Sequence, residues 1–216
     1  MNRIFLEEVF SAERMQKYFR RQPSDDLKSL LHYQYNILAS EAFYPSISVL
    51  EVALRNSVDR ELAVKFGGPD WYRHFSTTPG LSNLINEIAL AQGQIKRRHE
   101  LVTPSKIVAE LTLGFWVRLF NSEYERVLWK DLRRAFPNLP KVDRKRHNVS
   151  APLNNFRIIR NRIFHNEPIC WNLSRIQQRH EEIVTVLGWI SKDLPGWLKP
   201  LDRFDRVLSE VKIGLG

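Results

Sequence analysis

The chain has 216 residues, of which 43% are hydrophobic and 26% charged, a composition typical of one globular domain rather than of a disordered segment. A single cysteine, Cys170, excludes an internal disulfide and a cysteine-based zinc cluster, so a reducing compartment is expected. The net charge of +9 favours a polyanionic partner such as RNA, DNA or anionic lipid, although many basic proteins bind none of these.

The first residues do not resemble a leader that directs export. Glu7 and Glu8 stand where a secretory signal has an apolar run. No stretch of the sequence approaches the ~18 apolar residues that a membrane-spanning helix needs. We therefore expect a soluble, cytoplasmic protein that makes no contact with a membrane.

Apolar residues recur at helical spacing along most of the chain. Ser24-Asp25-Asp26 supplies N-cap residues before the first helix, Gly67-Gly68-Pro69 follows the second as a stop, and Thr103-Pro104-Ser105 lies at the start of the fourth. Residues 137–150 indicate a basic connection, and Pro195-Gly196 indicates a break. The predicted helices cover residues 27–38, 47–62, 81–99, 107–119, 123–136, 151–166, 174–192 and 201–212.

No segment shows the sustained period-two alternation of a strand, and no internal repeat is found. We therefore predict an all-α fold, a helical bundle with additional N- and C-terminal helices. The whole chain, residues 1–216, is expected to form a single domain.

Residues 157–169, RIIRNRIFHNEPI, hold the most informative pattern. On a helical wheel Arg160 falls inside the apolar arc, where a guanidinium is costly unless it is paired. Asn161 and His165 lie on a narrow polar strip beside that arginine. Pro168 disfavours helical geometry before it, so His165 should occupy the last turn, where the helix dipole favours a charged imidazole.

An arginine and a histidine suffice for RNA cleavage without a metal. Histidine moves protons for the attacking ribose 2′-hydroxyl and the leaving 5′-oxygen, while arginine holds phosphate oxygens in a bidentate manner. The expected products are a 2′,3′-cyclic phosphate and a 5′-hydroxyl. Five residues on a helix separate the two side chains by about 140°, so the pair must converge through the length of the arginine, a distorted last turn or a second protomer.

The spacing of these two residues is not distinctive by itself. Arg175 and His180 have the same spacing on what the sequence indicates is an ordinary solvated helix. The first occurrence differs in its context, which is Asn161 directly after the arginine, an apolar pair before the histidine and Asn-Glu-Pro-Ile after it.

Three segments follow patterns that occur together in one family. Residues 160–165, RNRIFH, pair an arginine with a histidine a few positions later, and HNEPI continues to residue 169. The other two segments are residues 44–56, YPSISVLEVALRN, and residues 111–117, LTLGFWV. Together they resemble the HEPN superfamily, and in particular its Abi-like (abortive infection) bacterial branch. Phe164 is bulkier than the small residue frequent at its position in that family.

The resemblance implies a HEPN-type helical bundle, with its core at about residues 25–190, that dimerises so that two motif helices face each other across a composite cleft. It implies a metal-independent endoribonuclease of bacterial phage-defence or toxin-antitoxin type that needs no cofactor. RNA is then the substrate, and an antitoxin or a regulatory RNA is a further expected partner. The superfamily also includes inactive members, so a non-catalytic RNA-binding or partner-binding module stays as the alternative function.

Each candidate residue has an expected role. Arg160 is expected to position phosphate and His165 to transfer protons, with Asn161 beside them; the alternative is a structural ion pair and a helix-terminal histidine. Glu51 is interpreted either as the buried partner of Arg160 or as a surface partner of Arg55 on its own helix. The expected RNA contacts are Arg157, Arg162, Lys145 and Arg146, and Glu167 is either a further supporting residue or a solvated one.

Base stacking by aromatic residues, metal binding and duplex-DNA binding receive less support from the sequence. Trp71, Trp116 and the other large aromatic residues indicate core more than base-stacking platforms. The remaining histidines show no metal-ligand spacing, so we predict no metal site. Duplex-DNA binding is a weaker alternative, because the sequence contains no convincing helix-turn-helix with a polar recognition helix.

Overall fold

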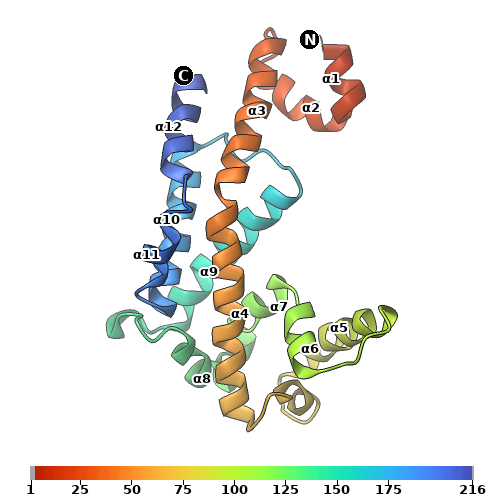
Figure 1. Ribbon diagram of the computed structural model, residues 1–216, viewed down its shortest axis with the longest axis vertical. Coiled ribbons are helices and arrows are strands. Elements are labelled where there is room, and N and C mark those ends of the chain that lie inside the picture. The colour runs from red at the N-terminus through yellow and green to blue at the C-terminus, as the bar shows by residue number, and fades with distance from the viewer. Residues whose placement is uncertain (1–2, 216) are drawn as a thin grey trace.

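The computed structural model describes residues 3–215, and within that range the secondary structure is helical, with no strand (Figure 1). The predicted all-α class is therefore confirmed. A long central rod, made of two helices placed end to end, organises the rest of the chain.

The rod consists of α3 (Asp26–Ala42) and α4 (Tyr44–Phe66). Asp25 caps α3 because its side chain accepts a hydrogen bond from the Lys28 amide at 2.8 Å. Gly67 ends α4 in a left-handed conformation, with φ 82°, that glycine adopts without strain. Both ends of the rod lie where the sequence signals predicted them.

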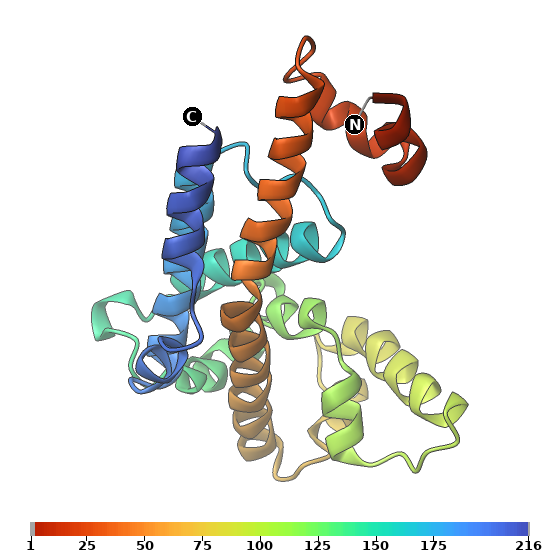
Figure 2. The ribbon, with the colours of Figure 1, turned by 45° about the horizontal axis from the view of Figure 1, so that its top comes forward.

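Helices from the second half of the chain pack along the rod. α12 (Phe204–Leu215) lies beside α3, and α10 (Leu173–Ile190) lies beside α4. α9 (Arg146–Phe164) crosses behind the rod near the junction of its two helices (Figure 2). α11 (Leu194–Leu198) forms a short helix around Pro195-Gly196, where the sequence predicted only a break.

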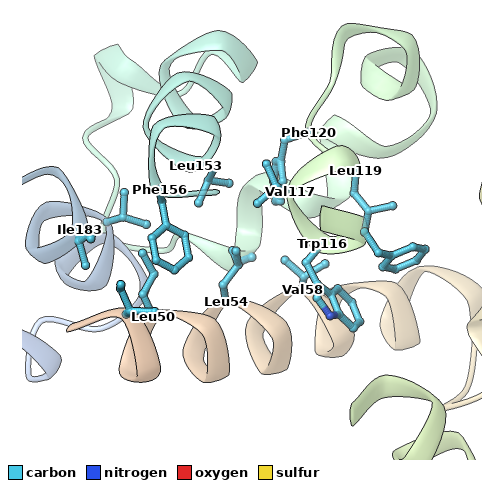
Figure 3. Close-up of a cluster of buried hydrophobic side chains, with 14 of the residues drawn as sticks. Leu50, Leu54, Val58, Trp116, Val117, Leu119, Phe120, Leu153, Phe156 and Ile183 are labelled. Atoms are coloured by element: carbon cyan, nitrogen blue, oxygen red, sulfur yellow. The ribbon is translucent and has the colours of Figure 1, made fainter. Parts of the chain in front are cut away.

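α4 supplies the centre of the hydrophobic core. Its buried residues Leu50, Leu54 and Val58 face α9, α10 and α7 (Leu113–Arg118) (Figure 3). The side chains that meet them are Trp116 and Val117 from α7, Leu153 and Phe156 from α9, and Ile183 from α10, none more than 2% exposed. The interpretation of Trp116 as a core residue is thereby confirmed.

The predicted fourth helix is two helices rather than one. α6 (Pro104–Glu110) ends at Leu111, whose backbone is extended with ψ 131°, and α7 follows it. Thr112 caps α7 because its hydroxyl accepts a hydrogen bond from the Phe115 amide at 3.3 Å, which competes with a continued helix. α5 (Ile85–Arg97), which packs beside α6, confirms the predicted third helix.

Two other predictions need correction. Residues 122–135, predicted as one regular helix, form successive 3-10, π and α turns, with α8 (Lys130–Leu132) among them. α9 begins at Arg146 rather than at residue 151, so the end of the predicted basic connection is helical and Pro152 lies inside the helix. Burial of Val149 in the core favours this longer helix.

α1 (Arg3–Phe10) and α2 (Ala12–Phe19) form a hairpin beside the start of α3 (Figures 1 and 2). Ser11 joins the two helices with a positive φ of 69°, and its hydroxyl accepts a hydrogen bond from the Arg14 amide. A small second core holds the hairpin in place and consists of Leu6, Met15, Tyr18, Phe19 and Tyr33.

The rod also meets a coarse test for a membrane span. Its 41 residues from Asp26 to Phe66 are long and apolar enough to cross a bilayer, a test that core helices of soluble proteins pass as well. The expectation that the protein makes no membrane contact, and is cytoplasmic, therefore stays a prediction.

Candidate active site

The C-terminal turn of α9 places the candidate histidine at the surface. The helix ends at His165 as predicted, and its last regular hydrogen bond runs from the His165 amide to the Asn161 carbonyl at 2.9 Å. Asn166 then adopts a left-handed conformation with φ 53°, and the Glu167 amide donates to the Arg162 carbonyl at 2.8 Å. This is a Schellman-type helix end, with asparagine in the position that glycine usually occupies.

A buried amide on the rod fixes the backbone after this turn. Asn36, in the middle of α3, is only 3% exposed. Its Nδ2 donates to the Glu167 carbonyl at 3.2 Å, and its Oδ1 accepts from the amides of Ile169 at 2.6 Å and Cys170 at 3.3 Å. Asn36 was not among the predicted site residues, although an asparagine three positions from the apolar Tyr33 and Ala39 is a signal of a buried polar contact.

Replacement of Asn36 by alanine should lower the free energy of unfolding by about 2 to 3 kcal/mol, because three backbone groups lose their partner and remain buried. Urea denaturation measures the change. Asn86→Ala, at an exposed position on α5, is the matched control and should stay within about 0.5 kcal/mol of the wild type. Equal midpoints for the two variants would contradict the clamping role.

Arg160 is held in place through its Nε, while both of its Nη groups stay free. Its Nε donates to Glu51 Oε1 at 2.6 Å, and the side chains of both residues are about 30% exposed. The guanidinium also lies over the Phe164 ring, 4.4 Å from the ring centroid. Neither Nη has a hydrogen-bond partner among residues 3–215, so both remain available for phosphate oxygens.

This pairing resolves the two interpretations of Glu51. The carboxylate pairs with Arg160, 109 positions away, and not with Arg55 on its own helix. The Arg55 Nε instead donates to Asn56 Oδ1 at 3.3 Å. The ion pair is half-buried, so its main effect is to orient the guanidinium rather than to stabilise the fold strongly.

Arg160 lines a groove of about 470 Å³, called here the Arg160 groove, between α4, the α6–α7 junction and α9. Its polar walls include Arg55, Arg157 and Asn161. Arg157 has no ion-pair or hydrogen-bond partner within the described chain, whereas Glu110 in the same groove is paired with Arg98 at 2.6 Å. The unpaired guanidinium groups give the groove a positive character that suits an anionic ligand.

The three segments that resemble the HEPN family meet in the Arg160 groove. Glu51 and Val52 come from the segment 44–56, and Leu111 to Gly114 come from the segment 111–117. Arg160 and Asn161 come from the third segment. Segments that are far apart in the sequence therefore build one surface.

His165 lies in a different groove. Its side chain is exposed and lines a hollow of about 220 Å³, called here the His165 groove, with Arg14, Lys17 and Glu167. Arg160 does not line this hollow, and His165 does not line the Arg160 groove. One protomer therefore does not bring the two candidate catalytic groups together in one groove. This agrees with the helical wheel, on which the two side chains point in different directions.

An apolar surface adjoins the same helix end. Ile37, Tyr44 and Phe164 are 51%, 60% and 48% exposed and line a third hollow of about 360 Å³. Its lining also includes Asn36 and Asn166 beside the His165 turn, and Phe164 contacts Arg160. The three residues Ile37, Tyr44 and Phe164 are called the apolar surface below.

The other expected RNA contacts are placed elsewhere. Arg162 holds the turn after α9, because its Nη2 donates to the Pro168 carbonyl and its Nε lies 3.4 Å from Glu167 Oε2. Arg146 is engaged with Glu125 at 2.9 Å and with the Phe120 carbonyl at 2.9 Å. Lys145 is exposed, but this end of α9 lies about 21 Å along the helix from Arg160.

Two further histidines and the cysteine lie outside both grooves, and burial shifts the pKa of each. His180, predicted on a solvated helix, is 6% exposed, and burial lowers its pKa although Asp202 lies 2.9 Å away. Burial also lowers the pKa of His32 and raises the pKa of the Cys170 thiol to about 12. No group of three or more His, Cys, Asp or Glu residues in the described range is arranged to hold a metal ion.

Comparisons of the chain with protein-family models, with curated proteins and with solved structures give no match. The resemblance to HEPN proteins therefore rests on the three sequence segments alone.

Proposed function

We propose that the protein is a metal-independent endoribonuclease of the bacterial defence or toxin type, in which two copies of the chain build a composite active site. The observation that supports it most is the state of Arg160. A half-buried guanidinium that lines a positive groove is oriented by Glu51 and Phe164, while both of its Nη groups stay free. These Nη groups make no hydrogen bond to the described residues, so an anionic ligand can replace the water around them.

In the proposed reaction, the His165 imidazole removes the proton of the ribose 2′-hydroxyl, and the 2′-oxygen attacks the adjacent phosphorus. The Arg160 Nη groups stabilise the charge on the non-bridging oxygens. The bond from phosphorus to the 5′-oxygen breaks, and that oxygen takes a proton from water or from a second imidazolium. Asn161, beside Arg160 in the groove, is the further candidate for contact with the substrate.

Two copies of the chain would bring the groups together. The apolar surface adjoins the His165 turn and contacts Arg160 through Phe164, so a second copy seated on it would lie between the two grooves. The His165 groove of one copy then faces the Arg160 groove of the other. Without such pairing, the separation of the grooves favours the alternative function, a non-catalytic RNA-binding module.

The test is incubation of the purified chain with total RNA in excess EDTA. We expect cleavage that yields 2′,3′-cyclic phosphate and 5′-hydroxyl ends, which end-group labelling distinguishes. A 5′-phosphate product, or a requirement for magnesium, would contradict the mechanism. RNA that is bound but left intact by the wild type would support the non-catalytic module instead.

A further inference from the structure

The N-terminal hairpin packs directly beside the candidate histidine. The second core fixes its position, and the Tyr18 ring lies 5.0 Å from Trp171, which follows the His165 turn in the chain. Arg14 Nη1 donates a hydrogen bond to the Asn166 carbonyl at 3.1 Å, across 152 positions of sequence. The turn that presents His165 is thus held on one side by Asn36 and on the other by the hairpin.

The side of α2 that faces this turn carries two cations. Arg14 and Lys17 are three positions apart, which places them on one face of the helix, and both line the His165 groove. Lys17 is exposed and has no ion-pair or hydrogen-bond partner in the described part of the chain. The groove also holds two acids. Glu167 is 3.4 Å from the Arg162 Nε, so its charge is partly neutralised, whereas Glu13 has no ion pair among the described residues.

An unpaired ammonium beside an exposed imidazole suits a strand that carries regularly spaced phosphates. If the scissile phosphate lies at His165, the neighbouring phosphate of a single strand has to pass along the same small groove. Lys17 is the unengaged cation in its lining, whereas Arg14 already uses one donor on the protein backbone. Lys17 is therefore free to bind a phosphate, whereas Arg14 holds the protein backbone.

We propose that the hairpin is part of the ribonuclease site: Lys17 binds the RNA phosphate next to the scissile one, and Arg14 is a positioning residue that holds the His165 turn. This inference rests on the proposed function for the identity of its ligand. It assigns RNA contact to the first 20 residues of the chain, where the sequence analysis placed no site residue.

The test for Lys17 uses a fluorescent single-stranded RNA with 2′-O-methyl sugars, which lacks the attacking 2′-hydroxyl and so binds without being cut. Lys17→Ala should weaken binding about three- to tenfold at low salt and reduce the slope of log affinity against log salt by about 0.7, the value for one lost phosphate contact. Arg20→Ala is the matched control, since it removes a cation from the same hairpin outside the groove. Equal slopes and affinities for the two variants would overturn the assignment of Lys17.

The test for Arg14 uses the cleavage reaction. Arg14→Ala should lower kcat about ten- to hundredfold with little change in KM, because a displaced imidazole misses the reacting atoms while RNA still binds. Arg14→Lys should restore much of kcat, since an ammonium also donates to the Asn166 carbonyl. An unchanged kcat, or equal loss in both variants, would overturn the positioning role.

Failure of the proposed ribonuclease function and failure of the inference about the hairpin give different results. A wild type that cuts no RNA contradicts the proposed function, yet the salt dependence of binding to the uncleavable strand still decides the Lys17 contact. A wild type that cuts RNA, combined with a Lys17→Ala variant that behaves like Arg20→Ala, contradicts the inference alone. Faster amide hydrogen exchange at residues 165–167 in Arg14→Ala is expected even without activity, and unchanged exchange would contradict the holding role.

Discussion

An equimolar mixture of Arg160→Ala and His165→Ala should recover about a quarter of the wild-type cleavage activity, although each variant alone should lose about 100- to 10,000-fold. Random pairing makes about half of the dimers mixed, and each mixed dimer has one of its two composite sites intact. The Arg160 of that site comes from one copy and the His165 from the other. Cleavage rates after subunit exchange measure the recovery.

The same mixture separates the composite site from a site within one protomer. A site that takes both groups from one chain is damaged in every copy, so the mixture would stay as inactive as its components. The control for exchange is co-purification: after mixing, affinity-tagged His165→Ala should retain untagged Arg160→Ala. Circular dichroism should show that both variants keep the helical fold, since both side chains are at least partly exposed.

Ile37→Glu should convert the proposed dimer to a monomer and reduce RNA cleavage at least about 100-fold. The side chain is 51% exposed in one protomer and lies on the apolar surface, where a buried carboxylate would be costly in a dimer but harmless in a monomer. Sedimentation velocity measures the mass and end-labelled RNA measures the activity.

Leu90→Glu provides the matched control for that variant. Leu90 is 61% exposed on α5 and lies outside the apolar surface and outside both grooves. The control should remain dimeric and active. A wild type that is monomeric and active, or an Ile37→Glu variant that remains an active dimer, would show that the apolar surface does not join two copies.

Helix ends were predictable from the sequence where residues next to the end determine it. Asp25 and Gly67 act through hydrogen bonds and backbone conformation within a few residues of themselves, so the ends of the central rod were predictable. The start of α9 depends instead on burial of Val149 against other helices. That burial is tertiary and outweighs the preference of Pro152 for a helix start.

In the candidate site, too, the features that depend on neighbouring residues were predictable and those that depend on distant contacts were not. The apolar surroundings of Arg160 indicated that its guanidinium needs a partner, and Glu51 was one of the candidates. No local pattern links Asn36 or Arg14 to the His165 turn, because their contacts span 131 and 152 positions. The helical wheel indicated that Arg160 and His165 diverge, but only the folded chain shows that they open into separate grooves.

The stiffness of the α3–α4 rod limits how two copies can meet. Asn36, behind the histidine turn, and Glu51, behind the arginine, are separated by about 22 Å of almost uninterrupted helix. In a symmetric dimer, the His165 groove of one copy meets the Arg160 groove of the other only if the two-fold axis passes near the midpoint of that span, close to Tyr44. The two rods would then run antiparallel and cross near that tyrosine, which is 60% exposed in a single copy.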